Sequence, residues 1–306
     1  SVVQNISLSG GTQSTFYRAS FNYRNVPGVL INTGLTQFNG RINITQKAFK
    51  NRLTIDLNFG ETERNSKIGF SEAFRYAAIY NPTSPVRSND PLYSAYGGYF
   101  QQSLYSYYNP VAIEEMNKNE GKDKILNAGA KIKIEILKGL SVDASYSIQK
   151  DENIAGTYYP RNDYFKGQNN IGYASKQQIN SSISQFESTL SYIRDINSNS
   201  SISFLAGYSS EKFKNDGYLA QGSHYPTDNY SLDNIQGGVY YTKNDLYYIW
   251  AYKALFSNLN LNINDFLFVF ANARYEATMN VVSNNTLFPS AGAGINLSRL
   301  LSANKP

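Results

Sequence analysis

The stretch KILNAGAKIKIEILKGLSVDASYSIQK, residues 124–150, decides the fold. Apolar or small residues occupy the even positions from Leu126 to Ile136 and again from Leu140 to Ile148, while the odd positions between them are polar or glycine. A strict period of two predicts two β-strands, each with one apolar and one polar face. Strands of about ten residues or more exceed the usual five or six of soluble proteins. They match the roughly 9–11 residues of a β-strand that crosses a membrane.

The same parity predicts the turn between these strands. Both apolar faces fall on even numbers, so they share one side of a sheet only if the loop has an odd number of residues. Residues 137–139 supply three, with Gly139 in the left-handed conformation that such a hairpin favours. The expected cross-strand neighbours are Ile136 with Leu140, Ile134 with Val142, and Lys133 with Asp143. We expect the last of these to form an ion pair, and the isoleucines at 132, 134 and 136 to face outward.

Composition narrows the class of protein. The chain has 306 residues, of which 41% are apolar, and its 26 tyrosines and 17 phenylalanines favour strands and interfaces between apolar and aqueous surroundings. No segment approaches the ~18 consecutive apolar residues of a transmembrane helix. The absence of cysteine excludes disulfides and thiolate metal sites. The net charge of +5 comes from scattered Lys and Arg, which gives no indication of nucleic-acid binding. Without an initiator Met or signal peptide, we expect a mature or truncated piece.

Strand-like segments continue along the chain, and their connections alternate between short and long. This alternation predicts an all-β, antiparallel, up-and-down transmembrane β-barrel, here a partial barrel over residues 1–306, with short periplasmic turns and long extracellular loops. We expect eleven strands in sequential order, forming an open, curved sheet. The expected strands are 3–9, 15–25, 35–47, 52–61, 124–136, 140–150, 179–194, 201–213, 245–261, 266–278 and 287–298.

Two segments break the alternation. Ile179 and Ile183 disagree in parity with the apolar residues that follow them, which predicts a bulge or a longer turn within 179–194. Residues 245–261 are aromatic on both faces, as expected of a wall covered on both sides, for example by a plug inside a barrel.

The longest connection, residues 62–123, is expected to be a loop insertion within the barrel domain. Residues 70–80 (FSEAFRYAAIY) predict a short helix that ends at Asn81-Pro82. The remainder is rich in proline and tyrosine, and its aromatic content argues against disorder. Its loop tyrosines could stack on sugar rings, although packing within their own loop is the more general use of such rings. These candidates are Tyr93, Tyr96, Tyr99, Tyr105, Tyr107 and Tyr108.

Polar residues on the opposite parity from the apolar ones would face the lumen of a barrel. They could contact substrate or plug, or simply provide the wet interior that every such barrel needs. The lumen candidates are Arg18, Asn22, Arg24, Arg41, Lys131, Lys133, Asp143, Arg274 and Glu276.

Catalytic and metal-binding patterns are weak. His224, the single histidine, lies in a polar loop sequence, so a solvated loop residue is the simpler interpretation. Residues 215–217 (NDG) suggest a turn rather than a calcium loop, and the glycines of 292–294 lie in a strand pattern rather than before a helix. We therefore expect no enzyme activity, no metal and no cofactor.

Several short motifs, in order along the chain, carry a family resemblance. The early ones are Leu8-Ser9-Gly10-Gly11-Thr12, Tyr17-Arg18-Ala19-Ser20 with Gly28, and Asn39-Gly40-Arg41-Ile42-Asn43. The middle ones are Asn81-Pro82-Thr83, Asn109-Pro110-Val111 and Leu137-Lys138-Gly139-Leu140. The late ones are Arg274-Tyr275-Glu276-Ala277-Thr278 and Phe288-Pro289-Ser290. Together they resemble the SusC/RagA-type TonB-dependent transporters, over roughly the first half of that family's barrel.

The resemblance implies a 22-stranded outer-membrane barrel of a Gram-negative bacterium, with a plug domain, a TonB box and later strands that are not among these 306 residues. It implies a SusD-like surface lipoprotein and TonB as partners, contact with outer-membrane lipid, and an oligosaccharide or peptide ligand. Two alternatives stay open at this point. One is a surface or soluble glycan-binding β protein that uses its tyrosine-rich loops, and the other is an outer-membrane enzyme such as a lipase.

Overall fold

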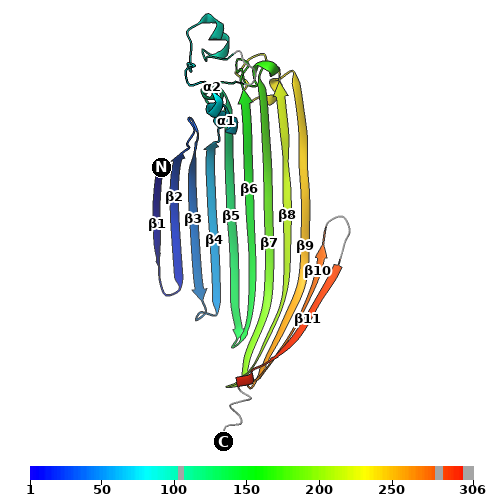
Figure 1. The fold of residues 1–306 in the computed structure, drawn as a ribbon. Coiled ribbons are helices and arrows are strands. Elements are labelled where there is room, and N and C mark those ends of the chain that lie inside the picture. The colour runs from blue at the N-terminus through cyan, green and yellow to red at the C-terminus, as the bar shows by residue number, and fades with distance from the viewer. Residues whose placement is uncertain (103–106, 280–284, 299–306) are drawn as a thin grey trace.

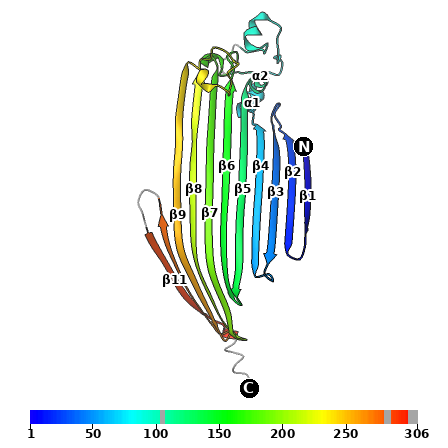
Figure 2. The same ribbon diagram turned by 180° about the vertical axis from the view of Figure 1, so that it is seen from behind.

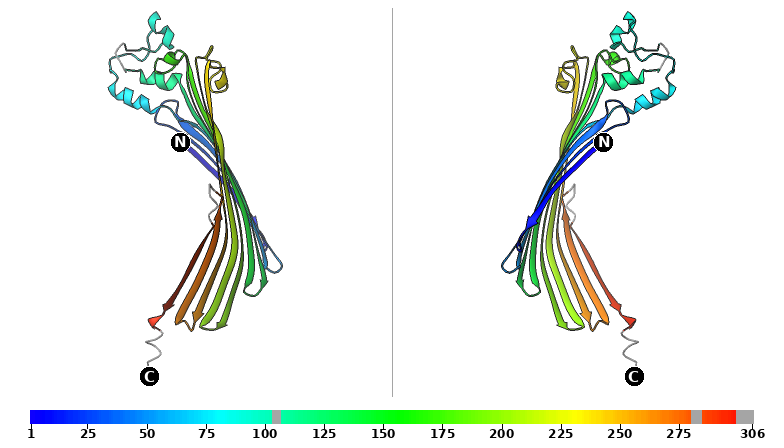
Figure 3. Two further views of the ribbon diagram at one scale, coloured as in Figure 1. Left: turned by 90° about the vertical axis from the view of Figure 1, so that its right-hand side faces the viewer. Right: turned by 90° about the vertical axis from the view of Figure 1, so that its left-hand side faces the viewer.

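The computed structural model describes residues 1–102, 107–279 and 285–298. Within them, eleven strands form one sheet in the order β1 to β11, and every neighbouring pair is antiparallel (Figures 1 and 2). The sheet is curved and open, with β1 and β11 as its two edges (Figure 3). The predicted number, order and direction of the strands are confirmed. Among the described helices, none has the length and apolar character needed to cross a bilayer.

The first four strands and the two helices come first in the chain, and the other seven strands follow. The strands are β1 Val2–Gly11, β2 Thr15–Pro27, β3 Gly34–Ala48, β4 Leu53–Lys67, β5 Lys118–Leu137, β6 Leu140–Tyr159, β7 Tyr173–Asn197, β8 Ser200–Ser223, β9 Tyr240–Ile263, β10 Leu267–Thr278 and β11 Asn285–Ile295. The helices are α1 Ser71–Ile79 and α2 Pro110–Met116, with 3-10 turns η1 Pro91–Tyr96, η2 Gln168–Asn170 and η3 Ile235–Gly237.

Strands β5 to β9 are much longer than the sequence pattern predicts. β7 has 25 residues, which at ~3.3 Å per residue is about 80 Å of extended chain. The pattern ended early because the apolar period stops where a strand leaves the membrane, while backbone pairing continues. The prediction of a turn at 215–217 is therefore wrong, since these residues lie inside β8.

The central hairpin confirms most of the predicted register. Ile134 pairs with Val142 and Lys133 with Asp143, and Gly139 has a φ of 84°. The pairing of Ile136 with Leu140 is wrong, because the register shifts between Glu135 and Leu137 and Leu137 takes that position. Ile136 is an extra, bulged residue in β5. The bulge and a two-residue turn together keep both apolar faces on one side of the sheet, which the prediction achieved with a three-residue loop.

The predicted irregularity in 179–194 is not present. β7 pairs continuously with β6 and β8 over this range, and its register shift lies at the turn, between Asp195 and Asn197. Ile179 and Ile183 are simply on the opposite face from Phe186, because this part of β7 lies beyond the apolar belt. The alternation required by lipid does not apply there.

The pairing register divides the side chains between two faces. The outer face carries an unbroken apolar belt, to which β4 to β6 contribute Leu53, Ile55, Leu57, Phe59, Ala128, Ala130, Ile132, Ile134, Val142, Ala144, Tyr146 and Ile148. The larger of these side chains are half-buried or exposed, and Leu57, Phe59, Ile132, Ile134 and Tyr146 are 41% to 50% exposed. The inner face at the same level is rich in Asn, Ser, Thr and charged residues. Such alternation is the signature of a barrel wall with lipid on one side and water on the other.

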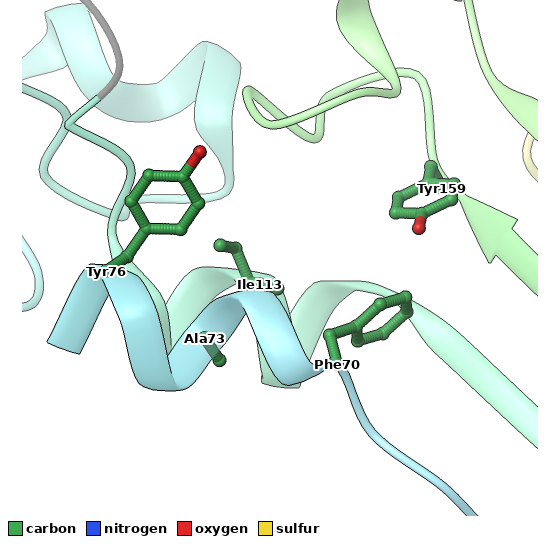
Figure 4. Packing of buried hydrophobic residues seen from close by; sticks show 5 residues of the cluster. All are labelled: Phe70, Ala73, Tyr76, Ile113 and Tyr159. Carbon is green, nitrogen blue, oxygen red and sulfur yellow. The ribbon is translucent and has the colours of Figure 1, made fainter.

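The long connections fold back over the far end of the sheet, on both sides (Figure 3). α1 and α2 pack on the inner side against the end of β6, where Phe70, Ile113 and Tyr159 form a buried cluster (Figure 4). On the other side, Tyr225 and Ile235 from the segment between β8 and β9 cover the outer face. The predicted helix at 70–80 is confirmed, with α1 ending just before Asn81.

Candidate ligand-binding site

The inner face brings together every lumen candidate that the sequence predicted. Cross-strand pairing places all nine on this one face, distributed from β2 to β10: Arg18, Asn22, Arg24, Arg41, Lys131, Lys133, Asp143, Arg274 and Glu276. They do not form one cluster, because they lie on five strands, β2, β3, β5, β6 and β10. Their contact with a ligand stays a prediction.

Short polar ladders connect some of these residues to their neighbours. The amide of Asn39 donates to Asn22 at 3.1 Å, and Thr62 donates to Asn39 at 2.6 Å. Arg274 pairs with Glu276 at 2.9 Å and lies 5.8 Å above the Phe256 ring. These contacts hold the inner side chains in fixed positions across adjacent strands.

The ion pair expected between Lys133 and Asp143 forms instead with Lys131. The Lys131 ammonium lies 3.7 Å from the Asp143 carboxylate, one pair position away along the strand. The diagonal contact is possible because side chains two residues apart on one face remain within reach of a long lysine.

A polar hollow of about 210 Å³ lies on the inner face, where β6 to β9 run side by side. Gln185 donates to the Glu211 carboxylate at 2.6 Å, the Tyr252 hydroxyl donates to the same group at 3.4 Å, and Ser147 donates to Gln185 at 3.3 Å. Ser145, Ser209 and Glu187 complete the wall. Hydroxyl, amide and carboxylate groups therefore converge on one small volume, which is the usual composition of a specificity site.

The ring of Tyr252 on β9 lines this hollow, and two more rings on β9 and β8 continue the row beyond the lining residues. The rings of Phe213 and Trp250 lie 5.9 Å apart at 26°, and those of Trp250 and Tyr252 lie 5.9 Å apart at 9°. The three rings form a nearly parallel row beside Glu211. An apolar row next to hydroxyls and a carboxylate suits a ligand that is itself part apolar and part hydroxylated.

Sequence reasoning missed this hollow. It noted that 245–261 is aromatic on both faces and attributed this to a wall covered on both sides. The inner rings at 250 and 252 belong to the row beside Glu211, while Tyr247 lies on the outer face with 67% of its surface exposed. The signal was present, but the residues of β6 to β8 that complete the hollow are about 40 to 100 positions away in the chain and became neighbours only through pairing.

The hollow extends from Ser145, level with the middle of the apolar belt on β6, to Glu211 at the extracellular edge of the belt on β8. On β8 the outward residues are apolar up to Tyr208 and are then Ser210 and Lys212. Glu211, which points inward between these two, is therefore at the extracellular edge of the membrane. A ligand entering from outside would reach the Glu211 end of this hollow first.

The loop tyrosines mainly pack against other rings of the long connections. We call α1, α2 and the loop between them the cover. Tyr108 packs edge-on against Tyr76 and Phe165, Tyr96 against Tyr164, and Tyr93 against Phe100. Tyr107 is 37% exposed, and Tyr105 lies outside the described residues.

Tyr99 has a different environment. Its side chain is 5% exposed, the Arg87 guanidinium lies 4.0 Å above its ring, and its hydroxyl donates to Glu115. Burial and the Glu115 carboxylate raise the pKa of Tyr99 to about 12, so it remains a neutral donor. The same hydroxyl and Arg87, 2.8 Å away, lower the pKa of Glu115.

Buried polar groups fix the cover over the inner side. Asn109 caps α2 by accepting from the amides of Val111 and Ala112, and its own amide donates to two carbonyls of the loop. Glu114 accepts from the Phe70 amide at 2.8 Å, and burial raises its pKa. Burial also raises the pKa of Asp163, which accepts from the amides of Lys166 and Gly167. A cover held in this way is a packed element rather than a free loop.

Neither metal binding nor histidine chemistry finds support within the described ranges. No cluster of three potential ligands occurs there. His224 follows β8 directly, where its ring shares a hydrogen bond of 3.2 Å with Ser223 and packs edge-on against Tyr240 at 4.7 Å. Packing at the end of the β8–β9 pair accounts for this histidine.

Two curated proteins are similar to nearly the whole chain. A TonB-dependent receptor P3 of Formosa agariphila is 25% identical over 96% of this chain and 30% of its own length. The TonB-dependent receptor SusC of Bacteroides thetaiotaomicron is 24% identical over 94% of this chain and 30% of its own length. The chain thus spans about 30% of the length of the curated relatives that it matches. No family model matches the sequence.

Solved structures share the fold. The RagAB peptide importer superposes with a TM-score of 0.76 in its closed-closed state and 0.77 in its open-open state, at 16% and 17% identity, over 99% of this chain and 35% and 34% of the importer chain. The ferric-catecholate import receptor Fiu of E. coli superposes less closely, with a TM-score of 0.54 at 8% identity over 95% of this chain and 48% of its own. The sheet architecture is therefore that of outer-membrane importers.

Proposed function

We propose that this chain, a SusC/RagA-type TonB-dependent transporter chain of the Gram-negative outer membrane, lines the passage through which a nutrient oligomer is imported. It is a transport protein and not an enzyme. The observation that carries the proposal is the polar, ring-bordered hollow around Glu211 on the inner face.

The two faces of the sheet support a route along its inner side. The outer face has a continuous apolar belt, whereas the inner face at the same height has cations, amides and hydroxyls. Water and polar solutes can therefore pass only on the inner side. In the proposed mechanism a plug stoppers this lumen, TonB supplies energy from the inner membrane, and no covalent bond is made or broken.

Oligosaccharide is the ligand class that the hollow favours. A sugar ring presents hydroxyls at its edge and C–H groups on its faces, so it can bond to Glu211 and Gln185 while contacting the Trp250 ring. A peptide fragment is the alternative ligand, and the named relatives include a peptide importer. The two classes are separated by the experiment below.

We also propose that the chain works with a SusD-like surface lipoprotein, as the resemblance to SusC and RagAB suggests. The packed cover formed by α1, α2 and the loop between them lies on the extracellular rim, on the inner side, where a lid-like partner would meet it. A cover that is already well packed can present a fixed surface to such a partner.

The alternative of a soluble glycan-binding protein conflicts with the outer face. Side chains such as Ile6, Leu8 and Leu255 are 59% to 72% exposed and belong to a belt that runs across every strand. A soluble monomer rarely exposes a contiguous apolar patch larger than a few hundred Å². The lipase alternative would need a base on the barrel wall, and His224 lies after the end of β8, where its ring packs against Tyr240.

The test is uptake by cells that carry single substitutions in the hollow. Glu211→Gln removes the carboxylate charge and Trp250→Ala removes the central ring, while Tyr247→Ala on the outer face of the same strand is the matched control. A hydrogen bond to a charged group is worth about 1.5–3 kcal/mol, so we expect ligand affinity to fall roughly tenfold or more. Labelled oligosaccharides and labelled peptides of equal size are compared, both for uptake and for binding to the purified receptor.

Loss of oligosaccharide uptake in both hollow variants, with Tyr247→Ala unchanged, supports the proposal. Loss of peptide uptake alone would show that the ligand is a peptide and not an oligosaccharide. Normal uptake of both ligands, with the variant receptors present in the outer membrane at normal levels, refutes a role for the hollow.

A further inference from the structure

The outer face changes character abruptly at the extracellular edge of the apolar belt. The last large apolar residues before a charged outer residue are Leu126 on β5, Ile148 on β6, Tyr208 on β8 and Leu255 on β9; on β9, Ile249 and Tyr247 follow further out. On all four strands the first charged outer residue beyond this edge is a lysine: Lys124, Lys150, Lys212 and Lys253. On β7, which runs between β6 and β8, the corresponding outer residues are Ser184 and Ser182. We call these four lysines, with Lys214, the lysine band.

Two lysines of the band lie on either side of one serine of β7 in the strand pairing. Lys150 pairs with Ser182, which pairs with Lys214, so the two lysines are two strand spacings apart, about 9–10 Å at the backbone. Together with Lys124, these residues line an outer groove of about 480 Å³ that has Leu126 on its apolar side. Ammonium and hydroxyl donors therefore border a space that opens toward the belt.

Acidic residues are fewer and lie mostly further from the membrane. Glu152 and Asp216 are each one outer position beyond a lysine, and Asp216 pairs with Lys214 at 2.9 Å. Glu61 and Glu63 lie at the β4 side, where Glu63 pairs with Lys122 at 2.8 Å. With Lys122 and Asp245, which lie in one register row, six lysines face five acids on this part of the outer face, which leaves a small positive surplus, and Asp151 also lines the groove.

The surplus is concentrated on β8 and β9. Lys212 lies between Ser184 and Ala251, and Lys253 lies between Ser210 and Ala277. None of these direct cross-strand neighbours is acidic. These two ammonium groups therefore face outward at the belt edge without a carboxylate beside them in the sheet.

We propose that the lysine band binds the phosphate groups of anionic lipids in the outer leaflet, with the acyl chains lying along the adjoining apolar belt. Lysines at the edge of a hydrophobic belt extend their ammonium groups to the headgroup layer, where phosphates lie. Serine hydroxyls between the lysines add neutral donors at the same level. The inference depends on the outer-membrane location of the sheet and not on which nutrient is imported.

The experiment uses the receptor extracted from outer membranes in detergent. Binding of dioleoyl phosphatidic acid is measured by native mass spectrometry for the unaltered receptor and for the double variant Lys150→Gln/Lys212→Gln. The matched control is Lys176→Gln/Lys243→Gln, which removes two lysines from the same face but further from the belt. Dioleoylglycerol, with the same chains and no phosphate, and inorganic phosphate, with no chains, are the companion probes.

Each lysine near an anionic surface is worth roughly fivefold in binding, so the band variant should bind phosphatidic acid roughly 30-fold more weakly. The control should keep the unaltered affinity, and dioleoylglycerol should bind weakly to all three proteins. Equal affinity of the band variant, or an equal loss in the control, overturns the proposal. Inorganic phosphate binding as tightly as phosphatidic acid also overturns it, because the site would then recognise a free anion. Since uptake is measured separately, failure here leaves the import proposal unaffected.

Discussion

The assignment of the two faces predicts opposite effects for adjacent substitutions on β6. The outer residues of its belt run from Leu140 to Ile148, a span of about 27 Å along the strand, or about 20 Å along the membrane normal at a tilt of ~40°. Ala144 is the middle residue of this span, so its side chain points to the centre of the hydrocarbon. Ser145 points to the lumen, next to Lys131 and Glu187 in register. Ala144→Lys should therefore cost about 2–4 kcal/mol. Ser145→Lys should cost about 0.5 kcal/mol or less.

Both variants are made in the complete receptor, which is unfolded with denaturant from lipid vesicles. The folded fraction is followed by the mobility difference that folded barrels show on gels without heating. A cost of 2–4 kcal/mol lowers the unfolding midpoint or prevents accumulation of Ala144→Lys, while Ser145→Lys follows the unaltered receptor. Equal costs, or a larger cost for Ser145→Lys, would show that the faces are assigned the wrong way round.

Three further predictions follow from single contacts and from the open edges. Gly139→Ala should destabilise the central hairpin by about 1–2 kcal/mol or more, seen as a lower midpoint, because φ is 84° and the new Cβ would lie 2.1 Å from the Ile193 carbonyl; an unchanged midpoint contradicts this. The pKa of Glu115 is lowered in the folded protein, so its contacts stabilise the cover fully above the unfolded pKa of about 4.3. This stabilisation is lost as the pH falls through the folded pKa of Glu115. Protease cleavage of the cover should therefore increase at acidic pH in the natural protein and change less in Glu115→Gln. Residues 1–306 expressed alone should aggregate without detergent, because β1 and β11 leave unpaired edges and the belt is exposed; monodisperse protein with a cooperative melt would favour the soluble glycan-binding alternative.

The sheet could be predicted from sequence because lipid imposes a strict rule on the strands that touch it. Where the outer face lies in the membrane, every second residue must be apolar, so the sequence predicts the strands around Ile42, Phe59 and Ile134 and the outward side of each. It predicts the pairing register only for the hairpin at Ile134. The side of each lumen candidate followed from the same parity. The hairpin turn was less certain because a bulge at Ile136 and a longer loop satisfy the same parity condition.

The ends of the strands and the hollow could not be predicted from the alternation of apolar and polar residues. Above the belt both faces of β7 and β8 are polar or mixed, so nothing local distinguishes a strand from a loop, and Asn215-Asp216-Gly217 resembled a turn. The hollow depends on pairing between residues on four strands, of which only the rings at 250 and 252 left a local signal. Pairing over such distances is a tertiary property that propensity alone does not contain.

The alternation that separates lipid from water also fixes the relative height of the two proposed sites. Glu211 and Lys212 are consecutive residues of β8, so the ligand hollow and the lysine band lie at the same level on opposite sides of one strand. If Lys212 marks the phosphate layer, Glu211 marks the point at which the lumen enters the membrane. A ligand held there has left the extracellular cover and adjoins Lys131, which pairs with Ser145. It has not yet passed the more periplasmic part of the wall, where Lys133 and Asp143 face inward. We infer that the hollow acts as the holding point from which a plug movement would release the ligand inward. Variants of Glu211 should then weaken ligand binding even when the plug is locked, whereas variants of Lys133 should affect passage and leave that binding unchanged. Equal effects of both variants on binding to a plug-locked receptor would refute this order of events.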